Sequence, residues 1–209
     1  MTNSCNVIQS ESMPPRQNEQ IIRLLAVAAF QKSHGYERVI ASLAQYYHGS
    51  VDRKIELYLV GYGDETIKYK KMVRQYGLEQ YVFFCGRKVG LELDHIYDRM
   101  DIALGLFGAY KRKLYSSSAL KVREYLAKGM PIASGCHEDA FEQEKNYKYY
   151  LEFSNDDSVI DMQRIVDFYK LVYEANTERE QIHREIREYA KKTVDLSVTM
   201  QPVIEYICS

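Results

Sequence analysis

The sequence predicts an α/β fold: a doubly wound, mainly parallel six-stranded sheet with helices on both faces and a helical C-terminal tail. Three observations predict this fold. Short and nearly continuous apolar runs alternate with segments that have apolar residues at helical spacing. These runs are typical of parallel strands that are covered on both faces, because a half-exposed strand would alternate apolar and polar residues. The chain has 209 residues, of which 46% are hydrophobic, and can bury the core that such a sheet requires.

The apolar runs and the helical segments follow one another along most of the chain. The six expected strands are residues 23–29, 54–60, 81–85, 101–107, 130–134 and 149–153. The expected helices between them are residues 36–47, 65–76, 91–100 and 119–128. Because helices separate most consecutive strands, each crossover returns the chain in the same direction, and the sheet is expected to be parallel.

The two ends of the chain differ from this pattern. Residues 1–20 are polar, contain Pro14 and Pro15, and are expected to form a linker or hinge. Residues 21–209 are expected to form one domain that includes C-terminal helices over about residues 157–208. We expect this highly charged tail to pack on the sheet or on a partner domain.

Composition excludes several classes of protein. Lys and Arg total 28 against 29 Asp and Glu, so a net charge of −1 gives no bulk attraction to nucleic acid or to an acidic membrane, and we expect no nucleic-acid partner. No apolar run approaches the roughly 20 residues of a membrane span. The four cysteines show no C-x-x-C pairing and follow no signal peptide, which indicates reduced thiols in a cytoplasm and argues against a zinc site.

The turns after the expected strands are where a ligand is expected, because ligands of such sheets bind beyond the carboxyl ends of the strands. The first turn contains His34 and Gly35, the second contains Gly61 in a G-x-G pattern, and the third contains Arg87. A longer loop, residues 108–118, carries three consecutive basic residues. The G-x-G pattern lacks the third glycine of a dinucleotide site, and no P-loop motif is present. For each turn alone, a glycine without any ligand is the alternative.

The stretch SSSALKVREYLAKGMPIASG, residues 116–135, predicts a helix followed by a strand. Apolar residues recur at i, i+3 and i+7 from Ala119, and Glu124 lies off this stripe. One interpretation is an exposed face in which Glu124 pairs with Lys128 and Lys121, at about 0.2–0.5 kcal/mol per pair. The other interpretation is that Glu124 contacts a ligand.

Read together, these segments resemble a known family. The segments LVGYGDE, GLEQYVFFCG, YDRMD and SSSALKVREYLAKGMPIASG, in this order, resemble the nucleotide-sugar-binding half of GT-B glycosyltransferases. Among these the resemblance is to the group 1, family 4-like retaining enzymes, which include bacterial polysaccharide and lipopolysaccharide enzymes. The tail REYAKKTVDLSVTMQPVIEYI is similar to the closing segment of that family, in which a late helix crosses to the first domain. The resemblance implies a Rossmann-like domain.

The resemblance also implies roles for residues of the 116–135 stretch. The family carries two glutamates seven residues apart, the first on the donor sugar and the second on the nucleotide ribose. Glu124 matches the second, while Ser116 stands at the position of the first. A diphosphate at the helix start would meet free N–H groups and the positive end of the helix dipole, with the ribose two turns along beside Glu124. The donor contacts expected at this helix start are Ser117, Ser118, Ala119, Leu120 and Lys121; for Lys121, a solvated side chain is the alternative.

The turn after the first strand departs from the family pattern. Many relatives have Gly-Arg there and Lys-Gly at the next helix, whereas this chain has Ala28-Ala29 and His34-Gly35. His34 could replace the missing cation when protonated or donate a hydrogen bond when neutral, and a purely structural histidine is the alternative. Lys32 and the basic residues 111–113 are further candidates for the diphosphate. Arg87 or Lys88 could lie near the base.

The resemblance implies the donor domain of a hexosyltransferase that acts in cell-surface polysaccharide or lipopolysaccharide biosynthesis. The expected donor is a UDP- or GDP-sugar, the expected reaction retains the anomeric configuration, and no cofactor or essential metal is expected. An N-terminal acceptor domain would complete the site, so the isolated domain is expected to be inactive. We expect a cytoplasmic protein that reaches the inner face of the membrane through the missing half. The alternatives are a non-catalytic module that binds a nucleotide or a protein and, less favoured, a sugar-nucleotide epimerase.

Overall fold

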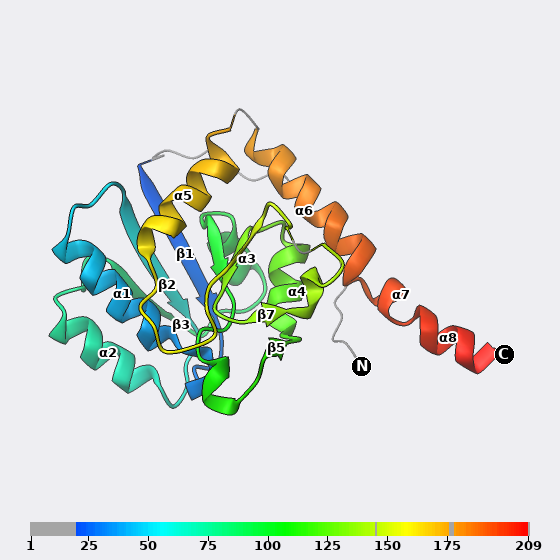
Figure 1. Cartoon of the computed structure of the whole chain (residues 1–209), viewed down its shortest axis with the longest axis horizontal. Helices are drawn as coiled ribbons and strands as arrows, with labels where there is room; N and C mark the ends of the chain where they lie inside the picture. Colours follow the sequence, from blue (N-terminus) through cyan, green and yellow to red (C-terminus); the bar gives the residue numbers. More distant parts are fainter. Residues whose placement is uncertain (1–19, 145, 176–177, 209) are drawn as a thin grey trace.

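The computed structural model describes residues 20–144, 146–175 and 178–208, so nearly all of the expected linker lies outside the described residues. A six-stranded sheet with the order β3-β2-β1-β4-β6-β8 forms the centre of the molecule (Figure 1), and every pair of neighbouring strands is parallel. Its strands are β1 (Ile21–Val27), β2 (Lys54–Val60), β3 (Val82–Gly86), β4 (Ile102–Leu104), β6 (Ile132–Ser134) and β8 (Tyr150–Glu152). The predicted fold class and all six predicted strands are confirmed, with ends that differ by a few residues.

The four predicted helices are also present, and they cover both faces of the sheet. They are α1 (Tyr36–His48), α2 (Thr66–Gln75), α3 (Leu91–Tyr97) and α4 (Leu120–Ala127). The chain moves one way across the sheet from β1 to β3 and the other way from β4 to β8. Since such crossovers are right-handed, α1 and α2 lie on one face and α3 and α4 on the other. The direction changes between β1 and β4, which makes this the topological switch point of the sheet.

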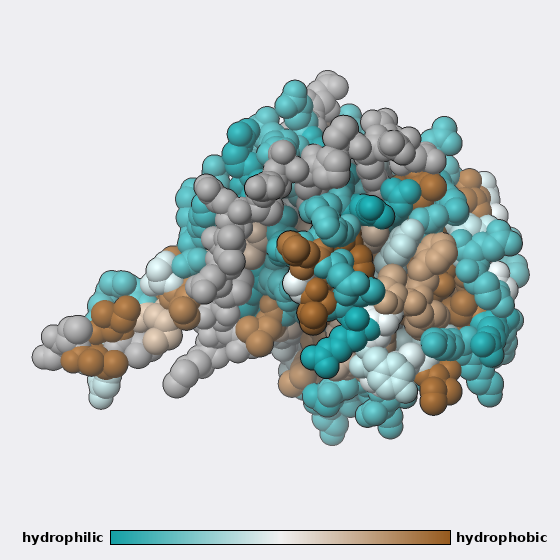
Figure 2. Space-filling view, turned by 180° about the vertical axis from the view of Figure 1, so that it is seen from behind, coloured by the Kyte–Doolittle hydropathy of each residue, from teal (hydrophilic) through white to brown (hydrophobic). Residues whose placement is uncertain are grey.

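The tail is helical, as predicted, and only its first part packs on the domain. Its helices are α5 (Met162–Tyr173), α6 (Arg179–Thr193), α7 (Leu196–Thr199) and α8 (Gln201–Cys208). Helix α5 contacts α1, and α6 contacts α4. Helices α7 and α8 project away from the domain (Figure 1) and carry exposed apolar residues (Figure 2). These residues are Leu196, Val198, Met200, Ile204, Tyr206 and Ile207.

A second, two-stranded sheet was not predicted. Strand β5 (Ser116–Ser117) pairs in parallel with β7 (His137–Glu138), which follows β6. Short 3-10 helices also occupy parts of the turns: η1 (Lys32–His34), η2 (Ala109–Arg112) and η3 (Asp139–Phe141). The β5–β7 pair is important for the site because it fixes the segment that leads into α4 beside Glu138.

Candidate functional site

A hollow of about 600 Å³ lies at the carboxyl ends of the first three strands. It is lined by Val27, Ala28, Ala29, Val60, Gly61, Tyr62, Arg87 and Lys88. Of the sequence-predicted site residues, Gly61 and Arg87 lie in this lining. Arg87 and Lys88 add positive charge to one wall, although Lys88 Nζ also lies 3.0 Å from Glu92 Oε1. The hollow is therefore suited to a ligand with an apolar or aromatic part and negative charge.

The glycines of these turns are required by contacts between segments of the chain. Gly61 has φ of +125°, and a Cβ atom there would lie 2.0 Å from the carbonyl oxygen of Ala28. Gly35 has φ of +67°, and its Cβ would lie 2.3 Å from the nitrogen of Gly108. Only glycine fits at either position, because both the backbone conformation and the space exclude a side chain. These contacts explain both glycines without a ligand, and they bring the turns after β1, β2 and β4 close together.

His34 is neutral at physiological pH and does not supply the missing cation. Burial, and then the charge of Lys121, lower the pKa of His34 to about 3. Its Nδ1 accepts a hydrogen bond from the backbone N–H of Gln31 at 2.9 Å. The neutral ring therefore carries its proton on Nε2 and can act there as a hydrogen-bond donor. Of the two chemical roles considered for His34, the structure supports the neutral one.

Lys121 lies in the first turn of α4 and points toward the switch point of the sheet. Its Nζ donates to the hydroxyl of Tyr36 at 2.6 Å and to the carbonyl oxygen of Gly105 at 2.9 Å. Gly105 directly follows β4, so these bonds tie the start of α4 to the carboxyl ends of the central strands. Burial lowers the pKa of Lys121 to about 7. Lys121 is therefore not the solvated lysine that was the alternative.

Glu138 is a buried carboxylate next to this lysine, and the sequence did not single it out. Its exposed fraction is 0%. The hydroxyl of Ser134 donates to its Oε1 at 3.0 Å, and Ser117 also hydrogen-bonds to the carboxylate. Burial raises the pKa of Glu138 to about 7, and the charge of Lys121 opposes this increase. Glu138 lies four residues after the end of β6, in a two-residue strand that carries no sequence signal for burial.

Glu124 is held by a tyrosine. Its Oε1 accepts a hydrogen bond from the hydroxyl of Tyr97 at 2.9 Å. Lys128 instead pairs with Asp94, at 2.6 Å between Nζ and Oδ1, and Lys121 bonds to Tyr36 and Gly105. The proposed exposed pairs of Glu124 with Lys128 and Lys121 are thus replaced by other contacts. Tyr97 belongs to the YDRMD segment, which links that motif physically to α4.

The N-cap residue of α4 is an alanine and not one of the serines that precede it. Helix α4 begins at Leu120, and its N-cap residue, Ala119, makes no side-chain capping hydrogen bond. Ser116 is exposed and Ser117 is buried, and both belong to β5. The N-cap side chain thus leaves the backbone N–H groups at the start of α4 uncapped, which is a suitable position for an anion.

The basic loop has formed contacts of its own. Lys111 pairs with Glu37, and Arg112 donates to the side chain of Gln31 at 3.4 Å. Lys113 is exposed. Part of the charge of this loop is consequently neutralised within the chain.

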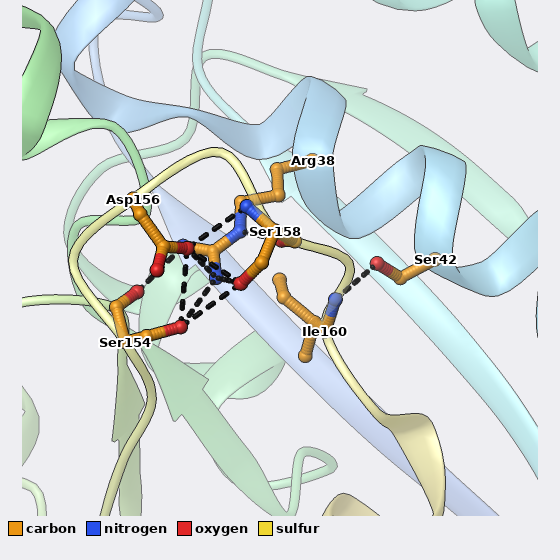
Figure 3. A network of polar contacts seen from close by, with 6 residues as sticks. All are labelled: Arg38, Ser42, Ser154, Asp156, Ser158 and Ile160. Carbon is orange, nitrogen blue, oxygen red and sulfur yellow. Dashed lines mark hydrogen bonds and ion pairs between the residues drawn. The ribbon is translucent and has the colours of Figure 1, made fainter.

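An arginine network, also missed in the sequence, supports the loop that leads to α4. Arg38, on α1, has a side chain that is 6% exposed and holds the loop after β8 (Figure 3). Asn155 of that loop donates to the carbonyl oxygen of Leu114 at 2.6 Å, just before β5. Residues of the loop that bond to Arg38 are Ser154, Asp156 and Ser158. The network joins α1, β8 and the approach to α4.

Two further properties concern the part of the chain that the structure describes. Within it, no group of three or more His, Cys, Asp or Glu side chains is placed to hold a metal ion. None of the helices in the same part has the length and apolar character needed to cross a membrane. Cys85 and Cys136 are free thiols.

No protein-family model and no curated protein sequence matches the chain. Its fold does match solved structures. The apo form of the lipopolysaccharide outer core galactosyltransferase WaaB has a TM-score of 0.71 and 14% identity, over 98% of this chain and 54% of that one. A glycosyltransferase from Rickettsia africae ESF-5 has a TM-score of 0.67 and 14% identity, over 90% of this chain and 48% of that one. Anabaena Alr3699/HepE in complex with UDP and glucose has a TM-score of 0.63 and 16% identity, over 90% of this chain and 48% of that one.

The chain spans about half the length of these structures. It has the fold of one domain of a GT-B glycosyltransferase, as expected for a C-terminal domain.

Proposed function

We propose that this chain is the nucleotide-sugar-binding half of a GT-B hexosyltransferase of cell-surface polysaccharide or lipopolysaccharide biosynthesis, with a UDP- or GDP-sugar as donor. The observation that carries the proposal is the arrangement of α4. Its uncapped start and Lys121 lie at the switch point of the sheet, and Glu124 follows one turn after Lys121. The complexes of Alr3699/HepE and of a pneumococcal O-GlcNAc transferase with UDP, among the structures of similar fold, support this choice of ligand.

In the proposed complex the diphosphate lies at the start of α4. The backbone N–H groups and the helix dipole stabilise its charge there, both in the bound donor and as the nucleoside diphosphate leaves. The contacts proposed at this end are Ser116, Ser117, Ser118, Ala119, Leu120 and Lys121, with the ribose on Glu124. His34 donates a neutral hydrogen bond beside Gly35, and the base occupies the hollow between Gly61 and Arg87.

Calorimetric titration of the chain with UDP, GDP, ADP and TDP tests this assignment. We expect weak binding of UDP or GDP, because one domain supplies contacts from one side only. We also propose that no essential metal takes part, so EDTA is expected to leave the affinity unchanged. The absence of a response to all four nucleotides would contradict the proposed function.

The chain is proposed to require an acceptor domain for transfer. Residues 1–20 would be the hinge, residues 21–209 the donor domain, and the exposed apolar residues of α7 and α8 would contact the other half. Any association with the inner face of the membrane would come from that half. The purified chain is therefore expected to transfer no sugar from UDP- or GDP-hexoses. Turnover by the chain alone would contradict this expectation. Retention of the anomeric configuration can be tested only in the two-domain protein.

The second candidate function is a non-catalytic nucleotide-binding module. Ser116, at the position of the donor-sugar glutamate, is an exposed residue of β5 and favours this alternative. If the chain with its neighbouring acceptor domain binds UDP or GDP but transfers no sugar, the module is the correct assignment.

A further inference from the structure

The Glu138 carboxylate is buried against the turn that follows β4, at Gly105. It is fully buried, and Ser134 and Ser117 hydrogen-bond to it. Its second oxygen, Oε2, has no hydrogen-bond partner among the described residues. A buried carboxylate that is incompletely hydrogen-bonded is costly unless a positive charge lies near it.

Lys121 is the positive charge that acts on this carboxylate, and both groups lie against Gly105. Its Nζ donates to the carbonyl oxygen of Gly105 at 2.9 Å. A Cβ atom at Gly105 would lie 3.1 Å from Glu138 Oε1 and 2.6 Å from Ser134 Oγ. The glycine thus allows the carboxylate to pack directly under the turn to which Lys121 is bonded. The β5–β7 pairing, with Ser117 opposite Glu138, holds the carboxylate in place.

We propose that Glu138 is a positioning residue whose buried carboxylate holds the charged Lys121 side chain at the switch point of the sheet, where Lys121 serves, beside the start of α4, as the cation for a nucleoside diphosphate. This inference rests on the proposed function. It provides a cation in place of the arginine and the lysine that the resemblance led us to expect after β1, where the chain has Ala28-Ala29 and a neutral His34.

The two groups titrate in the same pH range, because burial raises the pKa of Glu138 to about 7 while it lowers that of Lys121. Burial lowers the pKa of Lys121 from 10.5 to about 7, and Glu138 is the charge that opposes this decrease. A lysine with such a pKa is only partly protonated near neutral pH, so its charge depends on the groups around it. A bound diphosphate would favour the protonated form.

The other titratable groups around the pair do not replace either member. His34 is neutral, and Asp139, which raises the pKa of Glu138, pairs with Arg123 at 2.6 Å. Three neighbours whose pKa values are raised, chiefly by burial, are uncharged at neutral pH: Tyr36, Tyr125 and Cys136. The carboxylate of Glu152, on β8, lies toward Cys136 and pairs with His137.

The test compares UDP and GDP affinity from pH 6 to pH 9 in the wild type and in Glu138→Gln, by calorimetry. Glutamine keeps the shape and removes the charge, so the pKa of Lys121 should fall further and the loss of affinity at alkaline pH should begin at a lower pH. At pH values above the pKa of Lys121, each unit by which this pKa falls weakens nucleotide binding about tenfold at a given pH. The difference in affinity between the wild type and Glu138→Gln should shrink as the pH is lowered. A merely structural defect would not produce this pH dependence.

Two further variants are the controls. Glu138→Asp keeps the charge and should restore the wild-type pH profile in large part. Glu142→Gln makes the same change at an exposed position four residues away and should leave the profile unchanged. Identical profiles for the wild type and Glu138→Gln would overturn the inference and leave the proposed function standing.

A measurement without ligand separates the inference from the proposed function. The pKa of Lys121 can be followed by NMR of its ¹³Cε–¹Hε signals, and it should be lower in Glu138→Gln than in the wild type. If Glu138→Gln fails to fold, Lys121→Met should raise the pKa of Glu138, observed at its ¹³Cδ. An unchanged pKa of the remaining partner would overturn the inference, whereas a wild type that binds neither UDP nor GDP would contradict the proposed function.

Discussion

At the scale of single residues, Glu124 has one partner within the fold, Tyr97, and a second, the ribose, only in the proposed complex. Its Oε1 accepts the hydrogen bond of Tyr97, whose exposed fraction is 1%. Alanine at position 124 would leave this hydroxyl unpaired, at a cost of about 1–3 kcal/mol of stability. Reduced nucleotide binding in that variant would therefore combine a lost ligand contact with a less stable protein. Glutamine separates the two effects, because its amide oxygen can still accept from Tyr97.

We predict that Glu124→Gln weakens UDP or GDP binding about tenfold while changing the melting temperature little. A hydrogen bond to a charged acceptor is worth about 1.5–3 kcal/mol, and the neutral amide forfeits part of it at the ribose. Tyr97→Phe is the matched control, since it should reduce stability and leave the carboxylate available to the ligand. Equal affinity in Glu124→Gln and the wild type would show that Glu124 serves the fold alone.

A second prediction at this scale concerns His183 and the stability of the folded protein at acid pH. Burial, and then the charge of Arg179, lower its pKa to about 3, and its ring contacts the carbonyl oxygen of Gly129, 2.6 Å from Nδ1. The unfolded chain binds a proton at this histidine below about pH 6.5, whereas the folded protein does not until about pH 3. This histidine therefore makes the free energy of unfolding fall as the pH is lowered through that window, by up to about 1.4 kcal/mol per pH unit.

We expect His183→Asn to remove this contribution to the pH dependence of the free energy of unfolding, because asparagine keeps a donor for Gly129 and does not titrate. Urea denaturation at several pH values should show that the wild type loses stability more steeply than the variant between pH 6.5 and pH 3. Parallel profiles of the two proteins would contradict the account of His183.

At the scale of elements, the turns after the strands are built by contact between neighbouring backbones. The turn after β2 passes so close to the turn after β1 that Gly61 has no room for a side chain. Gly77, after α2, also has a positive φ, of +65°, but no atom lies within 4 Å of its hypothetical Cβ. The two positions therefore separate the cost of backbone conformation from the cost of a steric clash.

We predict that Gly77→Ala costs about 1–2 kcal/mol, the usual penalty of a left-handed conformation for a residue with a Cβ. Gly61→Ala should cost substantially more or prevent folding, because its Cβ would lie 2.0 Å from the oxygen of Ala28. Denaturant midpoints of the two variants make the comparison. Similar midpoints would mean that the turn relaxes and does not require glycine.

The six strands and four central helices could be predicted because each repeats a pattern over several residues. Strands buried on both faces produce continuous apolar runs, and helices with one buried face produce apolar spacing. Strands β5 and β7 have two residues each and no such pattern. The site was predicted in part: α4 was identified, but the burial of Glu138 depends on Gly105 and Ser134, which reach it only through the fold.

At the scale of the whole molecule, the chain is one domain with a projecting apolar tail. Helices α5 and α6 complete the domain, while α7 and α8 extend beyond it (Figure 1). The chain corresponds to about half the length of each similar structure. A second hollow of about 600 Å³ lies beside the edge strand β8, lined in part by Phe141, Tyr147 and Tyr150. This second hollow is an alternative place for a nucleotide to bind, and it is not the proposed site.

The position of the bound nucleotide is the most direct test of the account. Backbone amide shifts of the ¹⁵N-labelled chain, titrated with UDP and with GDP, would locate it. We predict that the largest shifts fall at residues 119–124 and in the turns that contain Gly61 and Arg87, and that they diminish in Lys121→Met. Shifts concentrated around Tyr147 and Tyr150, or no shifts with either nucleotide, would contradict the central claim that the start of α4 binds a nucleoside diphosphate.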